Sequence, residues 1–115
     1  MALGPAARAA LAALALAIMA PGFACAEDTP EFAITIRDHR FEPAEIHVPA
    51  GKRTILRISN EDDMSEEFDS TSLKVEKVIA ARASGTIRLR ALEPGRYDFI
   101  GEYHDATAKG VVIAE

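Results

Sequence analysis

Short runs in which aliphatic residues alternate with polar ones follow one another along most of this chain, and this alternation constrains the fold more than any other feature. A period of two places every second side chain on one face of a strand, whereas a helix needs a period near 3.6. No helical period competes convincingly after residue 26, although residues 65–79 are ambiguous. Seven runs predict short strands: residues 32–36, 46–48, 54–58, 73–79, 87–90, 97–99 and 111–113.

Turn-forming residues separate these runs. Pro49-Ala50-Gly51, Ser84-Gly85 and Glu93-Pro94-Gly95 supply the fixed φ of proline or the permissive φ of glycine that chain reversals need. Short strands with turns about 8–12 residues apart are typical of an all-β antiparallel sandwich, whose inner faces bury the alternating aliphatic side chains. No linker or internal repeat interrupts residues 27–115, so we expect one domain there.

The first 26 residues have the layout of a secretory signal peptide. They carry one charge, Arg8, then an apolar block over residues 9–20, a Pro21-Gly22 break and the small residues 24–26. The apolar block is shorter than the roughly 20 residues that cross a bilayer. Gly22 stands where lipid attachment to Cys25 would need a large aliphatic residue. We therefore expect cleavage after residue 26, export to the periplasm and no stable membrane insertion afterwards.

The composition of residues 27–115 excludes several classes of function. Cys25 is the only cysteine and leaves with the leader, which excludes disulfides, a catalytic thiolate and cysteine-ligated metal sites. Loss of Arg8 changes the net charge from −5 to −6, and the remaining basic residues are scattered among acids. Nucleic acid binding needs a basic stripe instead, so we expect no nucleic acid partner.

One acidic segment does not read as an ordinary strand or turn. Residues 60–69 hold six carboxylates together with Met64 and Phe68. A solvated acidic loop is one interpretation. Against it, so many like charges raise one another's pKa unless a cation offsets them. The segment contains no glycine, so it is not a calcium loop of the EF-hand type.

A second segment, residues 97–110, resembles the C-terminal ligand loop of cupredoxins. In that family a strand of the form Tyr-x-Phe-x-Cys is followed by a histidine and then by a methionine before the last strand. Phe41-x-Pro43, residues 46–51 and Ile58-Ser59-Asn60 also resemble a cupredoxin, so the resemblance covers nearly all of residues 31–114. It implies a cupredoxin-like antiparallel Greek-key β-sandwich of about seven strands.

The family's ligand pattern is only partly present in this sequence. Its C-terminal histidine matches His104, but its cysteine falls on Gly101 and its methionine on or near Ala108. Its other histidine matches Glu66. Blue copper requires two histidines, a thiolate and a weak axial thioether, so blue electron transfer is excluded.

The substituted set is rich in oxygen donors and has one imidazole. Such ligands suit harder ions, favour Fe(III) over Fe(II) and also suit Cu(II). His104 could instead be a structural hydrogen-bonding group, and Glu76 could pair with a basic neighbour. Met64 could bind Cu(I) or pack in the loop, His39 and His47 read as surface residues, and Asp62 and Asp63 as solvated charges. We predict six metal ligands: Glu66, Glu67, Asp69, Glu76, Glu102 and His104.

Among cupredoxin-like proteins, the chain most resembles the small periplasmic component of bacterial high-affinity iron uptake systems of the Ftr and Efe type. The segments that carry this resemblance are residues 66–70, 75–79, 101–104 and 107–110. The resemblance implies copper as a cofactor and iron as substrate or ligand. It also implies three partners: an inner-membrane iron permease, a membrane electron acceptor and a periplasmic iron-binding protein.

Three functions follow from these residues. In the first, Fe(II) binds Glu66, Glu67 or Asp69 with Glu102, and a copper ion near His104 or an external partner accepts its electron. This is a copper-dependent ferroxidase component that hands iron to the permease. The second is a periplasmic carrier of copper or iron without redox turnover. The third is a purely structural sandwich. A hydrolase is disfavoured, because the serines lack a nearby histidine motif.

Overall fold

The structure, a computed structural model, describes residues 29–115. The predicted signal peptide, residues 1–26, lies outside the described residues and stays a prediction. No helix in the described part is long and apolar enough to cross a membrane. Nine strands and one short 3₁₀ helix follow in order: β1 (Glu31–Arg37), β2 (Arg40–Glu42), β3 (Glu45–Val48), β4 (Thr54–Asn60), β5 (Glu66–Ser70), β6 (Val75–Ile79), β7 (Ser84–Leu89), β8 (Gly95–Gly101), η1 (Glu102–His104) and β9 (Lys109–Ala114).

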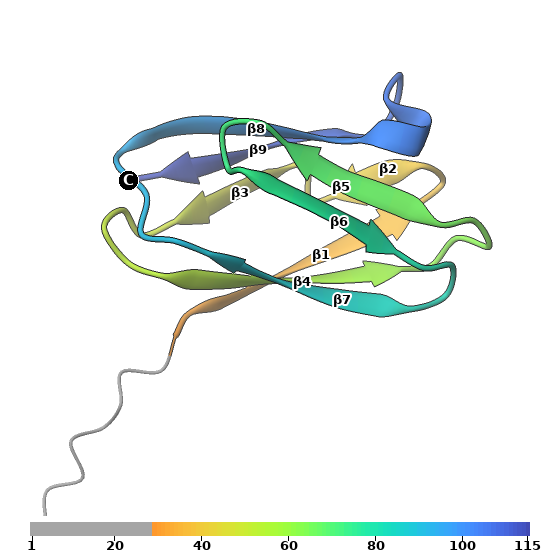
Figure 1. Ribbon diagram of the computed structural model, residues 1–115, viewed down its shortest axis with the longest axis horizontal. Coiled ribbons are helices and arrows are strands. Elements are labelled where there is room, and N and C mark those ends of the chain that lie inside the picture. The colour runs from red at the N-terminus through yellow and green to blue at the C-terminus, as the bar shows by residue number, and fades with distance from the viewer. Residues whose placement is uncertain (1–28) are drawn as a thin grey trace, which may run out of the picture.

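The strands form two sheets that face each other, as Figure 1 shows. One sheet has the order β2-β1-β4-β7 and the other β3-β9-β8-β5-β6. The predicted all-β sandwich is confirmed. Two neighbouring pairs, β1 with β4 and β3 with β9, run parallel, while the other pairs are antiparallel.

The structure has nine strands where the alternation predicted seven. The two additional strands are β2, which is only three residues long, and β5, which begins inside the acidic segment. β5 alternates as strictly as any other strand, but a glutamate and a serine occupy two of its three inward positions. Because those inward residues are polar, the alternation was hidden in an apparent acidic loop.

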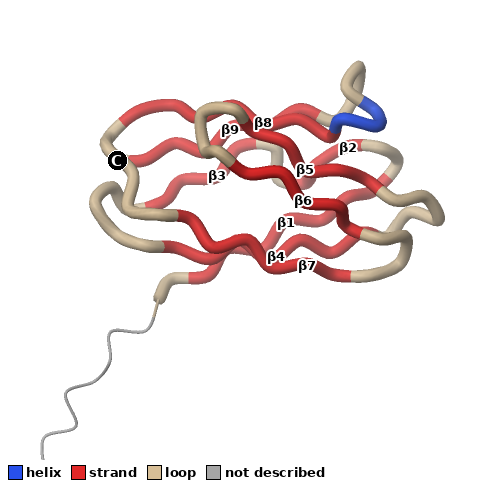
Figure 2. The backbone as a smooth tube through the Cα atoms, in the orientation of Figure 1, coloured by secondary structure: helices blue, strands red, loops and turns tan. Residues whose placement is uncertain are grey.

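An aromatic cluster joins the two sheets near the end of the sandwich that carries η1. Phe68 of β5 stacks on Phe99 of β8 with ring centroids 4.6 Å apart. Phe41 of β2 meets both rings edge-on, at 6.0 and 4.9 Å. All three side chains are buried, so this cluster fixes β5, which carries three of the six predicted metal ligands, and β8, which leads into η1 with two more. Figure 2 shows η1 at the end of the sandwich opposite the C-terminus.

Candidate metal-binding site

The four positions matched to the cupredoxin ligand pattern lie together at the η1 end. Glu66 begins β5, Gly101 ends β8, His104 ends η1, and Ala108 directly precedes β9. A Cβ atom built on Gly101 would lie 2.6 Å from Cδ of Glu66 and 2.6 Å from Cβ of Ala108. The Gly101 N–H also donates to the carbonyl of Ala108 at 2.8 Å. The fold therefore brings these positions into contact even though the residues differ from the family's ligands.

The carboxylate of Glu66 is buried and fully hydrogen-bonded. Only 1% of the residue is exposed. Its Oε1 accepts the backbone N–H groups of Tyr103 at 2.9 Å and Glu67 at 3.0 Å. Its Oε2 lies 2.6 Å from Nδ1 of His104. An ionised carboxylate only accepts hydrogen bonds, so toward such a partner Nδ1 of His104 is the donor, and in a neutral imidazole Nε2 then holds the lone pair.

The loop after η1 holds His104 in place. The carbonyl of His104 accepts the N–H groups of Thr107 at 3.1 Å and Ala108 at 2.8 Å, so a tight turn follows the 3₁₀ helix. The His104 side chain remains 18% exposed. One edge of the ring is therefore anchored inside the protein, while part of the ring stays within reach of solvent.

A second histidine joins the site, which corrects the interpretation of His39 as a simple surface residue. The rings of His39 and His104 are stacked, with centroids 3.7 Å apart and planes inclined by 11°. His39 lies in the two-residue turn between β1 and β2. Asp38 and His39 both have positive φ, 52° and 57°, as in a type I′ hairpin turn. Asp38 suits such a turn, but His39 stands where glycine usually follows, so the sequence signal for this turn is weak.

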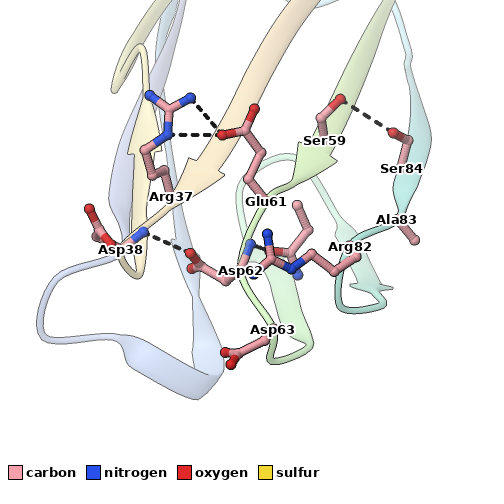
Figure 3. A pocket seen from close by; sticks show the side chains of 10 residues that line it. Arg37, Asp38, Ser59, Glu61, Asp62, Asp63, Arg82, Ala83 and Ser84 are labelled. Atoms are coloured by element: carbon pink, nitrogen blue, oxygen red, sulfur yellow. Dashed lines mark hydrogen bonds and ion pairs between the residues drawn. The ribbon is translucent and has the colours of Figure 1, made fainter.

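Asp62 and Thr107 hold this turn from both sides. The Asp62 carboxylate accepts the N–H groups of Asp38 at 2.8 Å and His39 at 3.0 Å, and the first of these bonds is drawn in Figure 3. Burial acts to raise the pKa of Asp62, but the two N–H bonds and the charges of His39 and Arg82 outweigh it and lower that pKa. Thr107 Oγ1 donates to the His39 carbonyl at 2.6 Å. Asp62, predicted to be a solvated charge, thus positions His39 against His104.

Four of the predicted ligands lie elsewhere: three on the outer surface of the five-stranded sheet, and Glu102 in η1, where it interacts with Glu67. Because side chains alternate along a strand, Glu67 and Asp69 point away from the core that holds Glu66 and Phe68. Asp69 lies directly opposite Glu76 of β6. We call these residues the outer carboxylate face: Glu67, Asp69, Glu76 and Glu102. Within residues 29–115, none of them forms an ion pair with a lysine or arginine.

The outer carboxylates interact unfavourably with one another. Desolvation, followed by the charges of Glu102, Glu76 and Asp69, raises the pKa of Glu67 above the usual glutamate value of 4.5. A hydrogen bond with Glu102 adds to this shift. The cluster therefore prefers to gain a proton or another cation, which is the behaviour expected of a cation-attracting surface.

The structure divides the six predicted ligands into two groups. Glu66 and His104 form the buried pair, and the other four form the outer carboxylate face. Across residues 29–115, no three His, Cys, Asp or Glu side chains are placed to hold one metal ion as they stand. A metal ion on the outer face would therefore require its side chains to rotate, which exposed side chains do readily.

The residues at the family's metal position do not fit a blue copper ion. The thiolate position is Gly101, and any side chain there would collide with Glu66 and Ala108. Both carboxylate oxygens of Glu66 are already engaged in hydrogen bonds. Two of the family's ligand positions, Glu66 and His104, thus contact each other directly instead of facing an ion between them.

A polar hollow of about 640 Å³ lies beside the site. Its walls come from the ends of β1 and β4, the start of β7 and the loop residues beside them, and they contain none of the six predicted ligands. Figure 3 shows Arg37 bonded to Glu61 and the Asp38 N–H bonded to Asp62, and all four residues line the hollow. The hollow therefore borders the turn that carries His39.

We expect Glu67→Gln to raise the midpoint of urea unfolding at about pH 7 and to leave it nearly unchanged at about pH 4. Glu67 has a raised pKa in the folded protein, so the wild type is relatively more stable when this group is protonated and loses stability as pH rises through its pKa. Glutamine does not ionise, so the variant avoids this loss of stability at higher pH. An equal gain at both pH values, or the same gain in the exposed control Glu93→Gln, would contradict this explanation.

Comparison with known proteins places this geometry in context. Residues 8–114 match the sequence profile described as the cupredoxin-like domain. An uncharacterized protein, RP394 of Rickettsia prowazekii (strain Madrid E), is 42% identical over 83 residues, covering 72% of this chain and 66% of that protein. The chain thus spans slightly under two thirds of the length of this relative.

Solved structures share the architecture at low sequence identity. The metal-binding domain of the Streptococcus pneumoniae D39 Cu(I)-exporting P-type ATPase CopA, solved with Cu(I), has a TM-score of 0.66 and 17% identity, covering 74% of this chain and 84% of that one. Auracyanin A, a blue copper protein of Chloroflexus aurantiacus, has a TM-score of 0.63 and 12% identity, covering 74% and 98%. At these identities the likeness concerns the fold alone.

Proposed function

Because the chain belongs to the cupredoxin-like domain family, we propose that it is an exported metal-binding protein of a bacterial high-affinity iron uptake system. In this proposal it works in the periplasm, takes up iron at the outer carboxylate face and delivers it to an inner-membrane permease. The signal-peptide pattern of residues 1–26 supports export. The resemblance of residues 66–70 and 101–110 to periplasmic iron-uptake cupredoxins supports iron as the cargo.

The observation that carries the proposal is the outer carboxylate face. Carboxylate oxygens are hard donors, and several of them together match the charge of Fe(III) better than that of Fe(II). Desolvation raises the pKa of Glu67 most, and the negative charges of Glu102, Glu76 and Asp69 raise it further. Binding a cation there relieves that repulsion, and the net charge of −5 of the whole chain helps to attract it.

The buried pair favours delivery over copper-dependent oxidation. A blue copper ion would accept the electron of Fe(II), but Gly101 and Glu66 leave no place for one. Copper as a second cargo gains support from the Cu(I)-bound domain of the CopA ATPase, which shares the fold. In the proposal, a periplasmic iron-binding protein and the permease are the partners for transfer.

Oxidation of Fe(II) on the protein is the second candidate function. The stacked imidazoles of His39 and His104 favour it, because His104 shares the short helix η1 with Glu102 of the outer carboxylate face. Each Fe(II) oxidised releases one electron, so this function requires dioxygen or a membrane electron acceptor to take it. Stopped-flow measurement of Fe(III) formation, with and without the protein, separates oxidation from delivery.

Binding of Fe(III) to variants of the outer carboxylate face tests the proposal. With iron supplied as a weak citrate complex, we expect Glu67→Gln/Glu102→Gln to lower the affinity of the purified protein at least tenfold, or about 1.4 kcal/mol. The two substitutions remove neighbouring donors and leave the buried pair intact.

A matched control removes the same charge from other strands and loops. Glu45→Gln/Glu93→Gln changes two exposed glutamates, one on β3 and one between β7 and β8. We expect this control to retain wild-type affinity for Fe(III). Equal loss in both double variants would mean that only net charge matters, and no measurable iron binding by the wild type would overturn the proposal.

A further inference from the structure

One side of the sandwich has two open strand edges. Among residues 29–115, β6 ends the five-stranded sheet and pairs only with β5, while β7 ends the four-stranded sheet and pairs only with β4. Figure 1 shows these two strands next to each other, joined by the loop of residues 80–83. They have five and six residues, whereas β3 and β2, at the opposite edges of the same sheets, have four and three. An edge strand of this length offers unpaired N–H and C=O groups to another chain.

A groove lies between these two edges, and we call it the β6–β7 groove. It consists of two hollows of about 520 and 300 Å³ that share Lys77 of β6 and Thr86 of β7 in their walls. The two strands are in contact at its base, since a Cβ atom built on Gly85 would lie 2.5 Å from Cδ1 of Ile79 and 3.2 Å from Cε of Lys77. Beyond the end of β7, Arg90 donates to two backbone carbonyls of the β5–β6 loop at 2.8 and 3.2 Å. Both ends of β7 are thus tied to the neighbouring sheet, so the groove is a fixed feature of the fold.

The β6–β7 groove is basic in a protein that is acidic overall. Its walls contain one acidic residue, Glu76, and four cationic residues: Arg57, Lys74, Lys77 and Arg88. Arg57 forms an ion pair with Glu31 at 2.8 Å. Within residues 29–115, the other three cations form no ion pair. Because the whole chain has a net charge of −5, this concentration of positive charge in one groove favours a partner that brings negative charge.

The cations lie on both sides of the position that a strand added to β7 would occupy. Lys77 is paired with the buried Phe68 across β5 and β6, so its side chain lies on the inner side of its sheet, toward β7. Arg88 is exposed and precedes the buried Leu89, so its side chain lies on the outer side of the other sheet. Successive side chains of an added strand would also alternate in direction. Acidic side chains on either face of that strand would therefore meet a cation.

We propose that the β6–β7 groove binds an acidic, extended segment of a partner protein, which pairs with the free edge of β7. In this mode of recognition, main-chain hydrogen bonds to the sheet edge supply affinity and side-chain contacts supply specificity. Here Lys74, Lys77 and Arg88 select acidic side chains, and Val78, which is 53% exposed in the wall of the larger hollow, adds an apolar contact. An extended chain fits this site better than a membrane surface does, because the open backbone groups lie along a groove.

Positive charge at a sheet edge also prevents two copies of a protein from pairing with each other. Pairing of β7 with β7 of a second copy would bring two basic edges together, and like charges opposite each other are destabilising. The same charges attract a strand that is rich in glutamate or aspartate. Repulsion of one partner and attraction of another together produce specificity. This inference goes beyond the proposed function, since it involves no metal ion and neither of the carboxylates changed in the iron-binding test.

Titration of the isotope-labelled protein with a synthetic peptide at low salt, followed by NMR, tests the inference. The probe is a capped hexapeptide in which glutamate alternates with valine, and the reference peptide has lysine in place of each glutamate. We expect the glutamate peptide to shift the amide signals of β7 and of Lys77. It should also slow hydrogen exchange along β7, because an added strand engages N–H groups at that edge. Its affinity should fall as sodium chloride is added, and the lysine peptide should not bind.

Two double variants with the same change in charge make the test specific to the groove. Lys77→Gln/Arg88→Gln should lower the affinity for the glutamate peptide about fivefold. Arg96→Gln/Lys109→Gln removes two exposed cations from β8 and β9 and should keep wild-type affinity.

Three results with these peptides would overturn the inference: unchanged hydrogen exchange along β7, equal loss of affinity in both double variants, or equally tight binding of the lysine peptide. Binding of citrate or of phosphatidylglycerol vesicles at the groove, without binding of the glutamate peptide, would also overturn it.

Discussion

Replacing Glu66 with alanine is expected to lower the free energy of unfolding by about 3 kcal/mol. Removal of this acceptor leaves the buried groups that donate to it unsatisfied, at a cost of about 1–3 kcal/mol for each group. We expect the lower end of that range because His104 is 18% exposed and can regain water. The N–H groups of Tyr103 and Glu67 lose their acceptor as well. Urea unfolding followed by far-UV circular dichroism measures the change.

Glu66→Gln provides the control for this prediction. Glutamine keeps an oxygen that accepts the two N–H groups, and its amide can donate to Nδ1 once the imidazole has changed tautomer. We therefore expect a loss of only about 1 kcal/mol, the usual net value of a hydrogen bond. If Glu66→Ala were as stable as Glu66→Gln, the buried pair would contribute little to the fold.

Replacing Gly101 with alanine is expected to cost about 1–3 kcal/mol, the usual penalty for overpacking a well-packed interior. The added Cβ would lie 2.6 Å from both Cδ of Glu66 and Cβ of Ala108. Ala108 belongs to a tight turn, and three hydrogen bonds hold the Glu66 carboxylate, so neither neighbour moves easily. Alanine also reduces the conformational entropy of the unfolded chain, which favours folding, but this gain offsets less than about 1 kcal/mol of the cost.

Two further measurements make the Gly101 prediction specific. The Glu66→Ala background lacks one of the two groups that the added Cβ would meet. There we expect Gly101→Ala to lower the free energy of unfolding by less, so that the effects of the two substitutions do not add. Gly101→Cys restores the family's thiolate but meets the same atoms, so we expect no blue absorption band with Cu(II). A stable, blue Gly101→Cys protein would show that the site has room for a blue copper ion after all.

The class of fold was predictable from the sequence because alternation of aliphatic and polar side chains is a local property. Runs such as residues 32–36 and 54–58 have a period of two whatever the rest of the chain does, and they became β1 and β4. β5 was missed because Glu66 takes an inward position, which a carboxylate usually avoids. The position is tolerated here because His104 and two backbone N–H groups form hydrogen bonds with the buried carboxylate.

The candidate site was predictable only in part. Spacing within the C-terminal segment singled out His104 and Glu102, and the matched pattern brought in Glu66. The sequence also predicted that Glu67, Asp69 and Glu76 would bind metal together with Glu66. Register places these three carboxylates on the outer surface and Glu66 inside, because one step along a strand reverses the direction of a side chain.

The sequence by itself determined the β-sandwich and the absence of a thiolate ligand, since periodicity and composition do not depend on distant contacts. Only the tertiary structure decided that His39 stacks on His104, since 65 residues separate them in the chain. That contact depends on a strained turn, on Asp62 from the β4–β5 loop and on Thr107 from the loop before β9. Each of these interactions joins segments far apart in sequence, so their geometry exists only after the two sheets have packed.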